Sequence, residues 1–216
     1  MRTLRCVPRH YLGNAGFFKM VVRVCVYIDG ANFYGGLRFI NPRYTDEKFD
    51  FENYIKYLTK KYSLIKIYYY NASLKQQLNK EPFRRQQILF SRLRKIKSCE
   101  VILCKRKPRI GVGGEEYHII KGDDVCLTLD MISDAYENLY DKAILISSDG
   151  DFTPLVERVR KLKKEVDVCY FEDCVSDDLL RASNRNNLIN KKIVKKFFFL
   201  KKKKLEKKEK KIRRIV

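Results

Sequence analysis

Five short apolar runs, separated by segments of helical character, constrain this chain more than any other feature of its sequence. The first run, Val21–Ile28, is almost continuously apolar and rich in β-branched residues, and it stops at Asp29 and Gly30. Such a run is typical of a strand that is buried on both faces. Four later runs have a similar character: 64–70, 101–104, 143–147 and 166–171.

The segments between these runs have the marks of helices. Thr153 followed by Pro154 is typical of a helix start. A helix is also predicted from Asp123 or Asp124 to about Tyr140, with an apolar stripe at spacings of four, three and four. That stripe consists of Val125, Leu129, Ile132 and Tyr136. Further helices are predicted over 51–61, 82–97 and a short stretch after Ser176, and a hairpin or loop over 105–120.

Strands that alternate with helices predict an α/β fold, here a three-layer α/β/α sandwich with a mostly parallel five-stranded sheet. The length of 216 residues fits one domain with extensions. Residues 20–190 form the expected domain, after an N-terminal arm or mispredicted start over 1–19. Residues 191–216 form a Lys-rich basic tail, expected to be disordered or helical.

The net charge of +21 indicates a polyanionic partner, with nucleic acid the first candidate. The tail alone has twelve Lys and two Arg against two Glu, which leaves +9 for the rest of the chain. No apolar run is long enough to span a membrane, and no secretory signal is recognisable. Seven scattered cysteines suit free thiols, and therefore a cytoplasmic protein.

Acidic residues follow two of the predicted strands. Asp29 ends the first strand, and Asp149 and Asp151 follow the fourth. Side chains at the carboxyl ends of neighbouring parallel strands converge, and a group of like charges is costly unless a cation neutralises it. Oxygen ligands without His or Cys favour Mg²⁺ or Mn²⁺. The alternative interpretation is that each Asp only forms a turn or starts a helix.

The helix that follows Gly122 offers further carboxylates. Asp123 and Asp130 are seven residues apart and share a face, whereas Asp124 and Asp130 diverge by about 120°. Asp124 could still turn inward as a first-turn residue. The periodicity leaves this choice open.

Three segments together resemble the signature blocks of the NYN domain, the LabA-like branch of the PIN-like nuclease superfamily. The segments are Val-Tyr-Ile-Asp-Gly-Ala-Asn at 26–32, Lys-Gly-Asp-Asp-Val-Cys-Leu-Thr-Leu-Asp at 121–130 and Ser-Ser-Asp-Gly-Asp-Phe-Thr-Pro-Leu at 147–155. The blocks occur in the family's order, and the resemblance spans about 21–190. It implies a PIN-like fold and a metal-dependent ribonuclease site.

The resemblance also implies roles for individual residues. The metal ligands would be Asp29, Asp124 and Asp149, and Asp151 would join them as a catalytic carboxylate. Supporting roles fall to Asn32, Asp130, Ser147 and Ser148, and Lys121 could contact the scissile strand. The residues that could bind nucleic acid outside these blocks are basic, and the alternative is a merely solvated surface: Arg84, Arg85, Arg92, Lys105, Arg106 and Lys107.

The leading hypothesis is therefore a cytoplasmic endoribonuclease that uses Mg²⁺ or Mn²⁺ to hydrolyse single-stranded RNA. One alternative is a non-catalytic RNA-binding adaptor with the same fold. Another is a structure-specific DNA nuclease. A homo-oligomer is left open.

Overall fold

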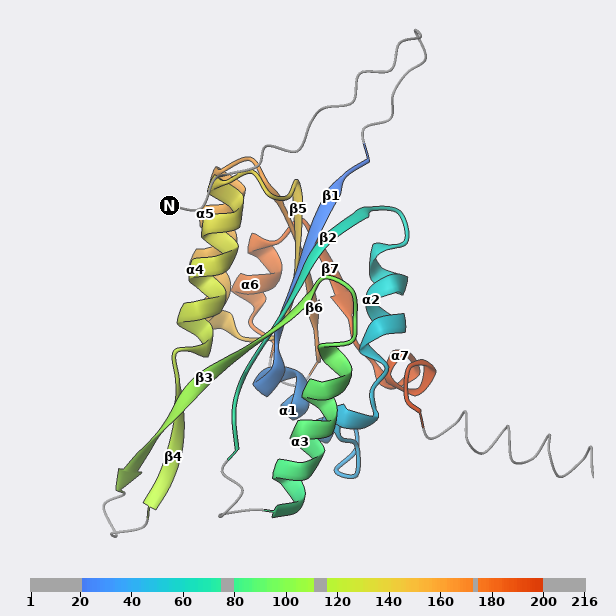
Figure 1. The fold of residues 1–216 in the computed structure, drawn as a ribbon. Coiled ribbons are helices and arrows are strands. Elements are labelled where there is room, and N and C mark those ends of the chain that lie inside the picture. The colour runs from blue at the N-terminus through green and yellow to red at the C-terminus, as the bar shows by residue number, and fades with distance from the viewer. Residues whose placement is uncertain (1–20, 75–79, 111–115, 173–174, 200–216) are drawn as a thin grey trace, which may run out of the picture.

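The computed structural model describes residues 21–74, 80–110, 116–172 and 175–199. The expected N-terminal arm, the glycines at 111–114 and residues 200–216 of the basic tail lie outside the described residues. The elements follow one another along the chain as strands separated by helices (Figure 1). In order they are β1 (Arg23–Asp29), α1 (Gly30–Ile40), the 3₁₀ helix η1 (Asp46–Lys48), α2 (Phe51–Thr59), β2 (Ser63–Ala72), α3 (Lys80–Leu93), β3 (Cys99–Ile110), β4 (Glu116–Lys121), α4 (Asp123–Tyr136), β5 (Lys142–Ile146), the 3₁₀ helix η2 (Gly150–Phe152), α5 (Thr153–Lys161), β6 (Glu165–Tyr170), α6 (Asp177–Ala182), β7 (Arg185–Leu188) and α7 (Lys191–Lys196).

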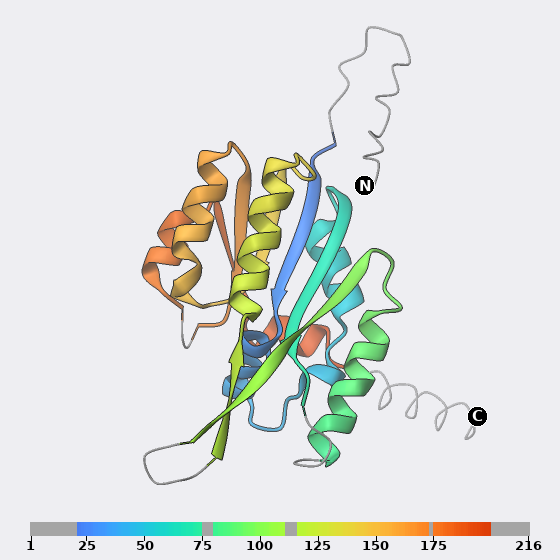
Figure 2. The same cartoon turned by 60° about the vertical axis from the view of Figure 1, so that its left-hand side comes forward.

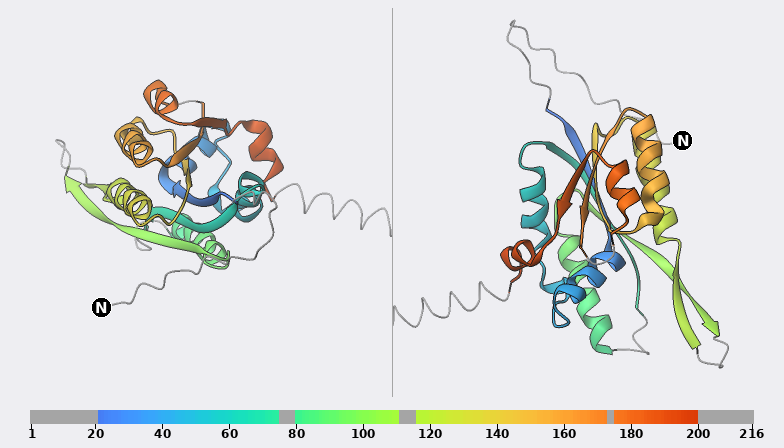
Figure 3. Two further views of the ribbon diagram at one scale, coloured as in Figure 1. Left: turned by 90° about the horizontal axis from the view of Figure 1, so that it is seen from above. Right: turned by 180° about the vertical axis from the view of Figure 1, so that it is seen from behind.

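The strands form one sheet in the order β4-β3-β2-β1-β5-β6-β7. All neighbours pair in parallel except β3 and β4, which form the antiparallel hairpin expected over 105–120. Helices α1, α2, α3 and α7 cover one face, and α4, α5 and α6 cover the other (Figures 2 and 3). The predicted α/β/α sandwich is confirmed.

The predicted number of strands is wrong, because the sheet has seven strands rather than five. The two additions, β4 and β7, are its edge strands. β7 spans only Arg185–Leu188, and its side chains are exposed or half-buried. A short polar edge strand lacks the apolar run that reveals a buried strand, so its membership of the sheet depends on tertiary pairing.

The apolar run at the start of the chain is explained by the two cores. Val24, Val26 and Ile28 of β1 belong to the core under α1, α2 and α3. Cys25 and Tyr27 belong to the core under α4, α5 and α6. Successive residues of a strand point to opposite faces, so a strand with a core on each side is apolar at every position.

Helix α1 has no counterpart among the predicted helices. Its sequence contains three glycines, which are poor helix formers. The helix nevertheless begins directly after β1, because the Asp29 side chain accepts a hydrogen bond from the Asn32 backbone N–H. Gly36 is required by packing: a Cβ there would lie 2.2 Å from the Phe171 ring.

The folded unit continues past residue 190, where the basic tail was expected to begin. Helix α7 buries Val194, and Phe197 packs against Tyr54 with ring centroids 5.3 Å apart. The Asp50 N–H donates to the Phe197 carbonyl at 2.7 Å. These contacts attach residues 191–199 to α2, so the change in charge along the sequence is not the domain boundary.

Three of the four residues of the predicted apolar stripe of α4 face solvent, and only Ile132 packs against the core. Val125, Leu129 and Tyr136 are 59–60% exposed, and the helix buries the opposite face, which includes Met131. The buried face also contains Asp134, which accepts hydrogen bonds from the Tyr27 and Tyr68 hydroxyls at 2.6 and 2.7 Å. Because a carboxylate occupies the inner face, counting apolar residues selects the wrong side of this helix.

None of the helices in the described part of the chain combines the length and apolarity that crossing a bilayer requires.

Candidate functional site

The carboxyl ends of β1 and β5 lie side by side at the centre of the sheet. Ile28 pairs with Ile146, so Asp29 and the segment from Ser147 to Asp151 lie together at the carboxyl ends of these two central strands. Helix α4 begins beside these strand ends after Gly122, whose φ of 96° is in the left-handed region that favours glycine. The turn at Gly122 brings the first residues of α4 to the two strand ends.

Asp29 is the most buried carboxylate at these strand ends, with 6% of its surface exposed. Its Oδ1 accepts from the Asn32 N–H at 3.0 Å, and its Oδ2 accepts from the Ser147 hydroxyl at 3.1 Å. Burial, together with the negative charges of Asp124 and Asp123, raises the pKa of Asp29 to about 6 despite the two hydrogen bonds, which lower it. Asp29 is therefore held rigidly in a place where its charge is unfavourable.

Asp124 is part of the same group of charges. Burial raises its pKa, and so do the charges of Asp123, Asp149 and Asp151. We call these five residues the acidic cluster: Asp29, Asp123, Asp124, Asp149 and Asp151. The sequence suggested four of them for the site, and periodicity could not choose between Asp123 and Asp124. The structure brings both to the cluster, because they lie in the first turn of α4.

Ser147 links the two strand ends that supply the cluster. Its hydroxyl donates to Asp29, and it accepts from the Asp149 N–H at 3.1 Å. Asp149 in turn accepts from the Asp151 N–H at 2.9 Å and caps η2. Both Asp29 and Asp149 thus form turns, as the alternative interpretation expected, but capping alone does not explain why five carboxylates gather.

Asn32 and Ser148 hold the loops around the cluster. The Asn32 Oδ1 accepts from the Ser148 N–H at 2.9 Å, which ties α1 to the end of β5. The Ser148 hydroxyl accepts from the Phe171 N–H at 2.9 Å, which ties β5 to the end of β6. Of the two serines, Ser147 is the one that contacts a carboxylate of the cluster.

Asp130 lies apart from the acidic cluster. Its carboxylate accepts from the Tyr70 hydroxyl at 2.9 Å, and the charges that act on it are those of Asp134, Glu100 and Lys66. It is not among the charges that raise the pKa of Asp29 or Asp124. The shared helix face of Asp123 and Asp130 therefore does not place them in one site.

The chemistry of the acidic cluster fits a hard divalent cation. Its ligands are carboxylate oxygens, and burial together with the neighbouring negative charges raises the pKa of Asp29 and Asp124, so their ionised forms are unfavourable without a neutralising partner. Within the described residues, no three His, Cys, Asp or Glu side chains are placed so that they could hold one ion together. The donor types fit Mg²⁺ or Mn²⁺, and the cluster is not closed around a coordination site.

Four of the predicted basic residues lie on the β3–β4 hairpin. Lys105 pairs with Lys121 in register, and Arg106 and Lys107 follow along β3. The hairpin extends beyond the carboxyl ends of β1 and β2, on the side of the sheet where α4 begins (Figures 1 and 2). Its backbone therefore carries these positions past the acidic cluster.

The three predicted arginines of α3 have different surroundings. Arg84 is exposed and lies 3.8 Å from Glu81. Arg85 lines a cavity beside α1. Arg92 donates to the backbone carbonyls of Glu47 and Phe49 and lies 4.2 Å from the Phe199 ring. Arg92 thus fastens η1 and residue 199 to α3, and its guanidinium is engaged inside the protein.

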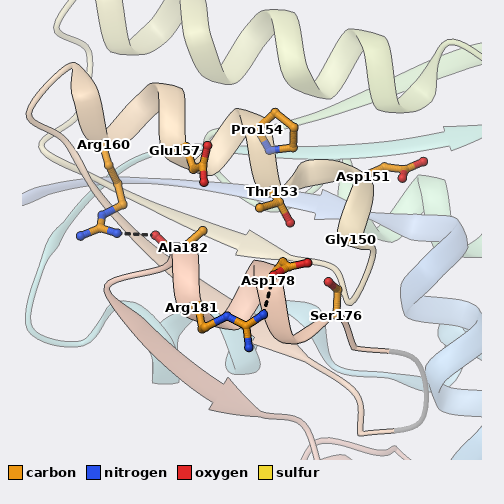
Figure 4. A pocket seen from close by; sticks show the side chains of 10 residues that line it. All are labelled: Gly150, Asp151, Thr153, Pro154, Glu157, Arg160, Ser176, Asp178, Arg181 and Ala182. Carbon is orange, nitrogen blue, oxygen red and sulfur yellow. Dashed lines mark hydrogen bonds and ion pairs between the residues drawn. The ribbon is translucent and has the colours of Figure 1, made fainter.

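A groove of about 710 Å³ begins at the edge of the acidic cluster and runs between α5 and α6 (Figure 4). Gly150 and Asp151 lie at one end, and Arg160 and Arg181 lie along it. Arg160 donates to the Ala182 carbonyl at 2.6 Å, and Arg181 pairs with Asp178. Sequence reasoning did not single out these arginines, because only the packing of α5 against α6 places them beside one another.

Comparison with known proteins agrees with this architecture. The crystal structure of a protein of unknown function, VPA0982 from Vibrio parahaemolyticus, is similar to this chain with 27% identity and a TM-score of 0.61. The similarity covers 80% of this chain and 96% of that protein. A search of curated proteins found no match to the chain.

The model of the NYN domain family matches residues 23–188, most of the chain. This range begins with β1 and ends with β7, so it includes every strand of the sheet. It also includes the five carboxylates of the acidic cluster. The chain belongs to the NYN domain family.

Proposed function

We propose that this protein is a metal-dependent ribonuclease that hydrolyses single-stranded RNA at the acidic cluster. The observation that carries the proposal is a group of five acidic residues at the end of β1, in the first turn of α4 and around η2 after β5, whose charges act on Asp29 and Asp124. A cluster of like charges destabilises a fold, and its presence is explained if it binds a cation.

Asp29, Asp124 and Asp149 are the residues that would hold the ion. When bound, a divalent ion lowers the pKa of water and neutralises charge on a phosphate. Asp123 and Asp151 add negative charge beside these ligands and keep the ion bound. Ser147 fixes the Asp29 carboxylate and the Asp149 backbone relative to each other, so the two strand ends keep one geometry.

Basic positions beside the cluster would bind the RNA backbone. The β3–β4 hairpin carries Lys105 and Lys121 in register. Phosphate contacts of this kind position a strand without reading its sequence.

The test is cleavage of a labelled single-stranded RNA by the full chain with Mn²⁺ present. We expect cleavage by the wild type and at least a 100-fold lower rate for Asp149→Asn. The matched control is Glu137→Gln, because Glu137 is an exposed carboxylate at the far end of α4. Equal rates for wild type and Asp149→Asn would overturn the proposal.

Two further measurements separate the alternatives. Salt-sensitive RNA binding without cleavage in any divalent ion would indicate an adaptor of the same fold. A DNA strand of the same sequence added as competitor separates the two nucleases: a DNA nuclease would be inhibited by it at the same concentration as by unlabelled RNA.

A further inference from the structure

A second cavity lies beside Asp29, on the face of the sheet that α1 and α3 cover. Its volume is about 330 Å³. Gly30 and Ala31, the first residues of α1, form part of its wall, so the cavity begins one residue after the Asp29 carboxylate. Other walls come from η1, the end of β2 and the start of α3.

The wall formed by η1 is rich in hydrogen-bond acceptors. Glu47 is 9% exposed; its Oε1 accepts from the Thr45 hydroxyl at 2.8 Å, and its Oε2 is buried and has no hydrogen-bond partner in the described part of the chain. Asp46 lines the same cavity, and burial, with the charge of Glu47, raises its pKa to about 6. A buried acceptor without a donor is unfavourable, so this wall is suited to a ligand that brings N–H groups.

The rest of the cavity is firmly built. The Gln86 side chain donates to the Ala72 carbonyl at 2.9 Å and accepts from the Leu74 N–H at 2.8 Å, which fixes α3 to the end of β2. Tyr34 of α1 also lines the cavity and is 38% exposed. An aromatic ring at the mouth of a cavity offers a surface on which a planar group can stack.

These features favour an uncharged planar ligand over a phosphate. Asp46 and Glu47 outnumber Arg85, the one cation among the lining residues that the structure describes, so the cavity disfavours an anion. A nucleobase is neutral, and its edge carries donors. Guanine presents an imino and an amino N–H side by side on its Watson–Crick edge, whereas adenine, cytosine and uracil each present one donor group beside acceptors. Unpaired bases are commonly recognised by such edge contacts together with stacking.

We propose that this cavity is a base-recognition subsite that takes an unpaired guanine of the RNA strand, with Glu47 as the residue that reads its edge and Tyr34 as the stacking platform. The inference rests on the proposed function, because it assigns the base next to the phosphate that the acidic cluster would cleave. It makes the enzyme selective for one nucleotide beside the cleaved bond.

The first test measures binding rather than cleavage. The full chain is titrated with the 5′-monophosphates of guanosine, adenosine, cytidine and uridine in the presence of EDTA, and the dissociation constants are compared by calorimetry. We expect guanosine monophosphate to bind about tenfold more tightly than the others, since its additional N–H meets a charged acceptor. Equal binding of all four nucleotides would overturn the inference.

Variants test the two residues separately. Tyr34→Ala should weaken guanosine monophosphate about tenfold, whereas Phe39→Ala should not, because Phe39 is an exposed aromatic of the same helix that does not line the cavity. Glu47→Gln should remove the preference for guanine while binding of the other nucleotides persists. Unchanged guanine preference in Glu47→Gln, in a variant that melts like the wild type, would contradict the assignment.

Failure of the inference can be told apart from failure of the proposed function. Guanine-selective binding by a chain that cleaves no RNA would support the base-recognition subsite and contradict the proposed ribonuclease activity. Cleavage at every nucleotide with equal rates would support the proposed ribonuclease activity and contradict the base-recognition subsite. Mn²⁺ that binds Asp149→Asn and is lost in the Asp149→Asn, Glu47→Gln double variant would show the cavity to be a cation site and also overturn the inference.

Discussion

Charged residues are arranged differently at the amino and carboxyl ends of strands β1 and β5. At the amino end, Arg23 of β1 pairs with Asp141 at 2.7 Å, and Lys142 of β5 lies 2.9 Å from both oxygens of the buried Asp167. At the carboxyl end, Asp29 and Asp149 follow the same two strands, and Asp123 and Asp124 join them from α4. Opposite charges neutralise each other at one end, and like charges accumulate at the other.

The amino end shows what this fold does when charge serves structure. Lys142 and Asp167 are both nearly inaccessible to solvent, and they are tolerated because each satisfies the other. At the carboxyl ends of β1 and β5, by contrast, carboxylates lie near other carboxylates. The acidic cluster is therefore not a requirement of the sheet, and a functional role explains its presence.

The largest effect is expected from disrupting the Lys142–Asp167 ion pair, and it is an effect on stability. Asp167→Asn removes the buried carboxylate partner of Lys142 and leaves it only the exposed Glu165, 2.8 Å away, so the free energy of unfolding should fall by about 3 kcal/mol, the lower end of the range for a broken buried pair. Urea denaturation measures it. The Lys142→Met, Asp167→Leu double variant should recover most of the loss, because two apolar residues can replace a buried pair. No loss in Asp167→Asn would mean that the pair is not needed at this end.

At the carboxyl end the corresponding substitution should cost activity instead. Asp29→Asn removes one of the proposed ligands, and RNA cleavage with Mn²⁺ should fall about 100-fold, equivalent to about 2.7 kcal/mol. The stability should be equal or higher, because the amide still caps α1 and a repelling charge is gone. If Asp29→Asn keeps full activity or is strongly destabilised, the contrast between the two ends fails.

Adding a cation should sharpen the comparison. Mn²⁺ at ten times its dissociation constant should stabilise the wild type by about 1.4 kcal/mol, because it binds only the folded cluster. The measurement is the thermal midpoint with Mn²⁺ and with EDTA. Asp149→Asn should show little of this gain, and Asp167→Asn should retain it. Equal gains in wild type and Asp149→Asn would place the ion elsewhere.

The smallest expected effect is on the pH dependence of stability without metal. The pKa of Asp29 is raised to about 6, so the folded state binds its proton more tightly than the unfolded state does. The free energy of unfolding should therefore rise as the pH falls from 7 to 5, by about 1 kcal/mol from this group. Denaturation in EDTA at the two pH values measures it.

Asp29→Asn provides the reference for this measurement. The variant should lose this part of the increase, while the contribution of Asp46, whose pKa is raised in the same direction, stays in both proteins. An identical pH dependence in the two proteins would show that the charge of Asp29 is not unfavourable in the fold.

The sequence predicted most of the fold because its buried strands have a local signature. Residues 24–28 have a core on each face, which makes them apolar at every position, and this run predicts the strand for that reason. β7 was missed because Arg185–Leu188 is a polar edge strand whose pairing with β6 leaves no local pattern. The apolar stripe of α4 misled because Asp134 replaces an apolar residue on the buried face.

The site followed a similar division. Asp29 and Asp149 were predicted to lie close together because they end two strands of a parallel sheet, and the pairing of β1 with β5 confirms that these strands are neighbours. Arg160, Arg181 and the cavity beside Asp29 were not predictable, since each depends on how helices from distant parts of the chain pack together.

The alternation of strands and helices, the three motif blocks and the carboxylates at the strand ends can all be read from the sequence. These are local properties, because burial on two faces and helix capping leave their mark within a few residues. Three outcomes depend on tertiary packing: Asp123 joins the cluster, Asp130 accepts from Tyr70 instead, and the Oε2 of Glu47 is buried with no donor among the described residues. Those outcomes depend on which surfaces meet when the chain folds, and no short stretch of sequence contains that information.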